Sequence, residues 1–143
     1  MEAVGIENPK LLSPLNLAFV GDAVYELMVR RRLVEGGSRP VSELHAEAVR
    51  YVRAGAQSMC YETLCAVLNE EETAILKRGR NANSVRPPKS STAIDYRRAT
   101  AVEALLGYLF LCGEHERLQQ LDGLMMETIR RQAEKMEVCE GEE

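Results

Sequence analysis

Residues 17–26 read LAFVGDAVYE and place Gly21 and Asp22 in the middle of an otherwise apolar helical stretch. A glycine inside a helix costs about 1 kcal/mol relative to alanine, and a carboxylate that faces a core needs a partner. The stretch TAVEALLGYLFL repeats this combination, because Glu103 is followed one turn later by Gly107. Each of these apolar helices thus carries one carboxylate and one glycine that allows another element to approach closely.

Two carboxylates brought together from different helices share a proton, pair with a cation or bind a metal ion. The chain has only two histidines, and its four cysteines form no CxxC pair, so oxygen ligands favour Mg²⁺ or Mn²⁺ over zinc. The alternative is structural: Asp22 pairs with an arginine in the core, and Glu103 does so with Arg30, Arg97 or Arg98. The residues alone leave both interpretations open.

The composition is that of one soluble globular domain. With 143 residues the chain can form a single core, and its contents of 45% hydrophobic and 28% charged residues are ordinary. The amino terminus, MEAVGIENPK, lacks the features of a secretory signal, and no apolar run reaches the roughly 18 residues of a membrane span. The cysteine pattern fits reduced thiols, so we expect a cytoplasmic protein.

Helical signals cover almost the whole chain and predict an all-α domain with a core at about residues 11–134. Ser13 and Thr92 are predicted N-caps, and glycines are predicted stops. The acidic tail, at about residues 138–143, is expected to be disordered. The predicted helices cover approximately residues 14–33, 41 to a break at Gly55, 56–68, 70 to a stop at Gly79, 93–111 and 114–136.

The chain has a formal net charge of −4, but its charges are unevenly distributed. Basic residues gather between Lys77 and Arg98, in and beside a long loop at residues 80–91, against the single acid Asp95. A local basic stripe can bind phosphate on an acidic protein, because screening confines charges to a range of about 8–10 Å. Ordinary solvated loop charges are the alternative.

The stretch LAFVGDAVYELMV resembles the signature of the ribonuclease III family, which reads like LEFLGDAVLEL, and VEALLGYLFL resembles the second motif of that family. The two motifs stand in the right order, each lies on a predicted helix, and the resemblance covers roughly residues 11–134. The stretches RGRNAN and YRRATAVEALLGYL are similar to the Mini-III subfamily, which has a ribonuclease III domain without an appended double-stranded-RNA-binding domain.

This resemblance implies a helical homodimer whose signature helices pack about a two-fold axis and leave a valley for duplex RNA. It implies an endoribonuclease in which a Mg²⁺-activated water cuts double-stranded RNA, with the precursor of 23S ribosomal RNA as substrate and a ribosomal protein as a candidate partner. A catalytically silent RNA-binding or ribosome-assembly module is the alternative. Helical periodicity leaves open whether the twin subunit or the core is contacted by Phe19, Val20, Val24 and Met28.

On this resemblance, Asp22 and Glu103 fall on acidic positions of the two motifs and are the expected catalytic residues and metal ligands. Ala18 and Thr100 replace two further acids of the family, so we expect a metal site that is poor in carboxylates. Glu26 lies one turn from Asp22 and is a further candidate ligand, with an exposed ion pair as its alternative role. The expected RNA-binding residues are Lys77, Arg78, Arg80, Asn81, Asn83, Arg86, Lys89, Arg97 and Arg98.

Overall fold

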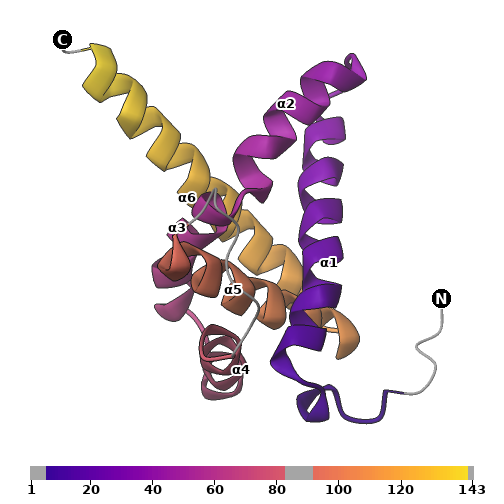
Figure 1. Cartoon of the computed structure of the whole chain (residues 1–143). Helices are drawn as coiled ribbons and strands as arrows, with labels where there is room; N and C mark the ends of the chain where they lie inside the picture. Colours follow the sequence, from indigo (N-terminus) through magenta and orange to yellow (C-terminus); the bar gives the residue numbers. More distant parts are fainter. Residues whose placement is uncertain (1–5, 83–91, 142–143) are drawn as a thin grey trace.

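The computed structural model describes residues 6–82 and 92–141, and every regular element in these ranges is a helix (Figure 1). The all-α prediction is therefore confirmed. Asn83, Arg86 and Lys89 lie outside the described residues. The elements are, in chain order, η1 (Pro9–Leu11), α1 (Pro14–Glu35), α2 (Val41–Val52), α3 (Ala54–Cys65), α4 (Glu70–Arg80), α5 (Ala93–Leu111) and α6 (His115–Gly141).

Side-chain caps fix the starts of three helices. Ser13 and Thr92 each accept a hydrogen bond from the backbone N–H three residues later, at 3.1 and 3.0 Å, and so begin α1 and α5 as predicted. Asn69 and Glu72 form a reciprocal capping box at the start of α4. These bonds satisfy backbone N–H groups that have no partner within their own helix.

Two glycines have roles that differ from the sequence prediction. Gly55 lies inside α3, because the break falls at Arg53, whose extended backbone separates α2 from α3. α4 continues past Gly79, whose missing Cβ would lie 2.8 Å from the Cα of Ala101 on α5. Gly79 therefore serves the packing of α4 on α5 and does not end the helix.

The end of α6 also differs from the prediction. Residues 138–141 were expected to be disordered because of their acidic composition, but they continue α6 to Gly141. The carboxyl-terminal end of α6 projects from the rest of the molecule (Figure 1). A helix that starts in a packed core can extend in this way, because nucleation is the costly step and each further residue adds a hydrogen bond. None of the helices in the described part of the chain is long and apolar enough to span a bilayer.

α5 is the central helix of the fold. It packs against α1, α3, α4 and α6, and most of its residues from Ala99 to Leu109 are buried (Figure 1). A helix that is apolar on nearly all sides requires neighbours on all sides, which explains why the other helices are arranged around it.

The contact between α1 and α5 is made by their backbones. A Cβ atom at Gly21 would lie 1.6 Å from the carbonyl oxygen of Glu103, and one at Gly107 would lie 2.0 Å from the carbonyl oxygen of Leu17. No side chain fits at either position, so both helices need glycine here. The crossing places Asp22, the residue after Gly21, on the same side of the fold as Glu103.

We expect Gly107→Ala to lower the free energy of unfolding by about 3 kcal/mol or more, because the added methyl group meets backbone atoms that cannot rotate away. Gly55→Ala is the matched control, since nothing lies within 4 Å of a Cβ at that position. This control should leave stability unchanged or raise it by up to about 1 kcal/mol. Urea unfolding measures both, and equal effects would contradict the proposed helix contact.

Candidate active site

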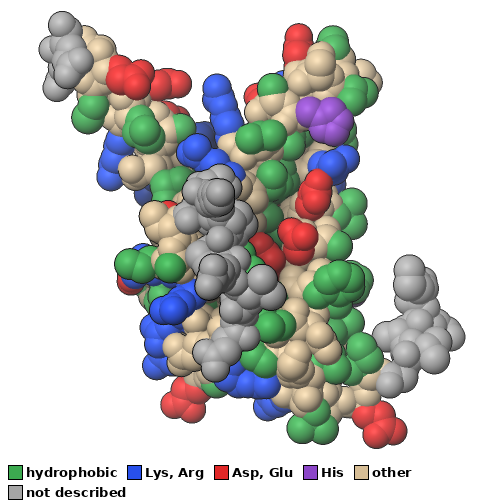
Figure 2. All heavy atoms as spheres, viewed as in Figure 1, with side chains coloured by type: hydrophobic (Ala, Val, Ile, Leu, Met, Phe, Trp, Pro, Cys, Tyr) green, Lys and Arg blue, Asp and Glu red, His purple; other side chains and the backbone are tan. Residues whose placement is uncertain are grey.

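Asp22 on α1 and Glu103 on α5 form a carboxylate pair beside the crossing of these helices. Asp22 is exposed and Glu103 is partly buried. The apolar stretch around Asp22 suggested a carboxylate that faces the core, but the helix turns this side chain outward while Gly21 faces α5. Figure 2 shows acidic side chains grouped beside the middle of α1.

The environment of Glu103 disfavours its charged form. The pKa of this carboxyl group is raised from 4.5 to about 8, first by burial and then by the negative charge of Asp22, while the neighbouring Gln57 side chain acts in the opposite direction. A cation between the two carboxylates would remove both unfavourable contributions. The pair therefore has the electrostatic character of a cation site.

Gln57 on α3 is a site residue that the sequence analysis missed. Its side chain is only 2% exposed, and its Nε2 donates a hydrogen bond to the backbone oxygen of Val52 at 3.0 Å. Its Oε1 has no hydrogen-bond partner among the described residues. Gln57 belongs to no motif, and its proximity to Glu103 arises only when α3 packs on α5.

The alternative role for the two carboxylates was pairing with arginines. In the described part of the chain, neither Asp22 nor Glu103 forms an ion pair. Arg30 pairs with Glu26 at 2.7 Å, and Arg98 pairs with a different glutamate on α3. Glu26 thus has the exposed ion pair that was its alternative role, and its carboxylate is held toward Arg30.

The donor set fits Mg²⁺ better than a metal that needs a complete protein cage. Among the residues that the structure describes, no group of three or more histidines, cysteines or acids is arranged to hold an ion. Ala18 and Thr100 contribute no carboxylate, and the hydroxyl of Thr100 donates to the backbone oxygen of Tyr96 at 2.9 Å. Mg²⁺ is commonly held by one or two carboxylates together with waters and substrate phosphates, which suits Asp22 and Glu103.

The arginines predicted to bind RNA differ in their contacts. Arg78 donates to the backbone oxygens of Lys10 and Leu12 at 3.0 and 3.1 Å, and so fastens the amino-terminal segment to α4. Lys77 and Arg97 are exposed. Figure 2 shows basic side chains gathered to the lower left of the acidic group, in the region of α3 and α4. Composition therefore predicted the basic region, whereas contacts separate structural arginines from available ones.

Arg80 and Arg98 both contact Tyr61 on α3. The Nη1 of Arg80 donates to the hydroxyl oxygen of Tyr61 at 3.0 Å, and the guanidinium of Arg98 lies over the Tyr61 ring, 5.1 Å from its centroid. Arg98 also pairs with Glu62 at 3.1 Å. Nε of Arg80 donates to Asn81 at 3.3 Å.

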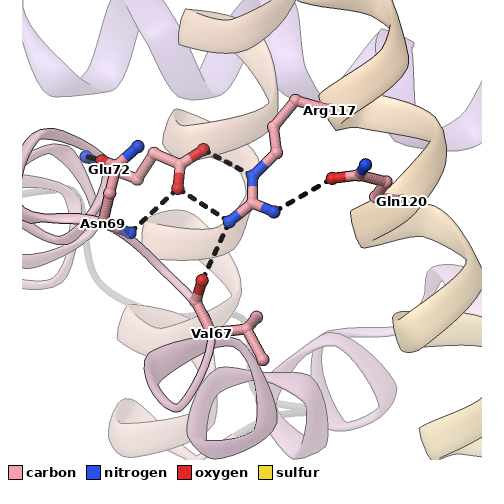
Figure 3. Close-up of polar contacts among 5 residues, drawn as sticks. All are labelled: Val67, Asn69, Glu72, Arg117 and Gln120. Atoms are coloured by element: carbon pink, nitrogen blue, oxygen red, sulfur yellow. Dashed lines mark hydrogen bonds and ion pairs between the residues drawn. The ribbon is translucent and has the colours of Figure 1, made fainter.

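A different buried acid, Glu72, is fully paired (Figure 3). Arg117 on α6 donates to its carboxylate through Nε and Nη2 at 2.8 and 2.9 Å, and also to the backbone oxygen of Val67 at 2.9 Å. Such two-point pairing is strong and directional, so it ties α4 to α6. Glu72 therefore supports the fold, in contrast to Glu103.

The fold is that of a ribonuclease III domain. Residues 15–114 match the family model described as Ribonuclease III domain. A crystal structure of a Fusobacterium nucleatum protein superimposes with a TM-score of 0.74 at 31% sequence identity, covering 82% of this chain and 94% of that chain.

Curated relatives define the group more narrowly. The chain is 48% identical over 118 residues to the Mini-ribonuclease 3 of Thermoanaerobacter sp. strain X514, which covers 82% of this chain and 83% of that protein. It is 46% identical over 116 residues to the Mini-ribonuclease 3 of Symbiobacterium thermophilum, covering 81% and 89%. The chain therefore belongs to the Mini-ribonuclease 3 group of the ribonuclease III family, which places it among the ribonucleases.

The pKa of Glu103 predicts how stability depends on pH in the metal-free protein. In the folded protein the Glu103 carboxyl group keeps its proton up to about pH 8, whereas in the unfolded chain it releases the proton near pH 4.5. The stabilisation of the folded state by this protonated carboxyl group is therefore complete below pH 4.5 and is lost as the pH rises to about 8. Thermal unfolding in the presence of a chelator should show this decline. Glu103→Gln should flatten it, and an unchanged pH dependence in that variant would contradict the assignment.

Proposed function

We propose that the protein is a homodimeric, Mg²⁺-dependent endoribonuclease that cleaves double-stranded RNA, with Mn²⁺ as a substitute ion. One observation carries the proposal: in a chain of the ribonuclease III family, Asp22 and Glu103 meet at a rigid helix crossing without a basic partner among the described residues. Such a pair favours a divalent cation over any structural role.

The residues at the candidate active site have different proposed roles. Asp22 and Glu103 would hold the ion, and the backbone contact at Gly21 and Gly107 fixes the helices that carry them. Gln57 is buried beside Glu103 and favours the charged form of its carboxylate. When bound, Mg²⁺ lowers the pKa of a coordinated water and neutralises negative charge on the scissile phosphate.

The RNA would be held through its phosphates and 2′-hydroxyl groups, because the shallow minor groove of an RNA duplex offers little sequence information. The basic region around Arg80 and Arg98 supports this part of the proposal, whereas Arg78 is occupied by backbone carbonyl groups. We propose the precursor of 23S ribosomal RNA as the substrate, presented by a ribosomal protein, as the resemblance to Mini-III proteins implies.

A silent RNA-binding module is the second candidate. Ala18 and Thr100 favour it, because they leave only two carboxylates where the family usually has more. The choice between the two functions therefore depends on whether two carboxylates suffice for hydrolysis.

An exposed apolar stripe on α1 supports the homodimer. Leu15, Phe19 and Leu27 are 38%, 82% and 67% exposed; Leu15 and Phe19 lie one turn apart, and Leu27 follows two turns further along the helix. Aligned large apolar side chains on a soluble protein mark an interaction site. Of the α1 residues that periodicity left open, only Phe19 points outward, and three pack in or against the core: Val20, Val24 and Met28.

We expect Asp22→Asn and Glu103→Gln each to reduce cleavage of a base-paired 23S precursor fragment by more than about 100-fold, above the 10–100-fold typical of losing an outer-shell partner. Each change leaves a neutral side chain of the same shape, so folding should be retained. Glu35→Gln is the control, because it removes an exposed carboxylate on the same helix that pairs with Arg31. Binding without cleavage by the wild type in Mg²⁺ or Mn²⁺, with the ribosomal protein present, would favour the silent module.

Phe19→Glu should convert the proposed dimer to monomers, because it places a charge on the apolar stripe that we propose as the interface. Val41→Glu on α2 is the matched control, since Val41 is 65% exposed but lies outside the stripe. Sedimentation velocity distinguishes the two states. A wild type that is monomeric at micromolar concentration, or a Phe19→Glu variant that remains dimeric, would refute this interface.

A further inference from the structure

Tyr61 joins two cations that come from different helices. It lies on α3 and is only 4% exposed, yet its hydroxyl contacts Arg80 at the end of α4 and its ring contacts Arg98 on α5. The hydroxyl oxygen accepts a hydrogen bond, and the ring face attracts the second guanidinium electrostatically. One buried side chain thus fixes the positions of two positive charges at the surface.

The charges in this cluster are only partly balanced. In the described part of the chain, the one carboxylate paired with either arginine belongs to Glu62, whose side chain is 71% exposed. An exposed pair of this kind contributes only about 0–1 kcal/mol. An incoming anion can therefore displace Glu62 at little cost. Two guanidinium groups, each planar and with several donors, match the oxygens of a phosphate group.

The arginine cluster and the carboxylate pair both lie where α3 packs against α5. Tyr61 follows Gln57 by one turn on α3, and Arg98 precedes Glu103 by five residues on α5, or about 7.5 Å along the helix axis. Because α3 and α5 pack along each other, the spacing between the two clusters is set by rigid helices. Both clusters are therefore carried by the same pair of packed helices, α3 and α5.

We infer that Tyr61 positions Arg80 and Arg98 as a binding site for one phosphate group of the RNA backbone. This inference rests on the proposed function, because the anion is part of the RNA substrate. Tyr61 is a positioning residue: it touches no RNA itself and acts through the two arginines.

The test measures binding of a blunt-ended RNA duplex in the presence of a chelator, so that no cleavage occurs, at several salt concentrations. Tyr61→Phe keeps the ring under Arg98 but removes the acceptor for Arg80, and it should weaken binding about 3- to 10-fold. Arg80→Gln and Arg98→Gln should each reduce the slope of log K against log salt by up to about 1, because one phosphate contact is lost. In the Arg80→Gln background, Tyr61→Phe should have no further effect.

Two further variants separate positioning from general stability. Glu62→Gln should tighten binding about 2- to 5-fold, because it removes the carboxylate that competes with phosphate for Arg98. Tyr108→Phe is the matched control: it removes the hydroxyl of another buried tyrosine, which donates to Glu71 and contacts neither arginine, and it should leave RNA binding unchanged. In cleavage assays, Tyr61→Phe should raise KM and leave kcat at the wild-type value.

The outcomes distinguish this inference from the proposed function. If the wild type binds the duplex and a folded Tyr61→Phe variant shows the same affinity and salt slope, the inference is overturned and the proposed function stands. If Glu62→Gln weakens binding, the inference is likewise overturned. If the wild type does not bind duplex RNA at all, both are overturned.

Discussion

The structure depends on one contact, the direct meeting of the α1 and α5 backbones at Gly21 and Gly107. Side-chain packing between helices can adjust by changing rotamers, but two backbones in contact have no such freedom. Glycine inside a helix costs about 1 kcal/mol at each position. In return, the two backbones can approach closely, and this contact fixes the distance between the two helices. The residues beside the contact, Asp22 and Glu103, are positioned as a consequence. The helix crossing is therefore also the frame of the candidate active site.

The same contact creates an electrostatic problem that the proposed cation would resolve. The pKa of Glu103 is raised to about 8 by burial and by the charge of Asp22, so the metal-free pair is unfavourable at neutral pH. Elsewhere the protein satisfies a buried acid completely, as with Glu72 and Arg117 (Figure 3). Glu103, which has no such partner among the described residues and lies next to a rigid contact, differs from Glu72, and local departures of this kind are expected at functional sites.

The sequence predicts local features well and contacts between helices poorly. The caps at Ser13 and Thr92 and the helix class follow from residue type and spacing alone, whereas Asp22 and Glu103 were selected by the resemblance to the ribonuclease III motifs. Gly79 shows the limit, because a glycine near the end of a helix predicts a stop, whereas its packing on α5 depends on how the helices cross. Gln57 and Tyr61 could not be identified for the same reason: nothing in their local sequence distinguishes them from other residues of α3.

α3 gives the two clusters a common support. Gln57 and Tyr61 are four residues apart and therefore lie on one face of this helix, where the first approaches Glu103 and the second holds Arg80 and Arg98. A helix does not stretch, so the negative cluster and the positive cluster keep a constant separation. The opposite charges are also kept apart, since Arg98 is held by Tyr61 and Glu62 on α3. An arginine free to reach the carboxylates would pair with them and take the place of a cation. Holding the arginines on Tyr61 would thus preserve both the proposed anion site and the proposed cation site on one acidic protein.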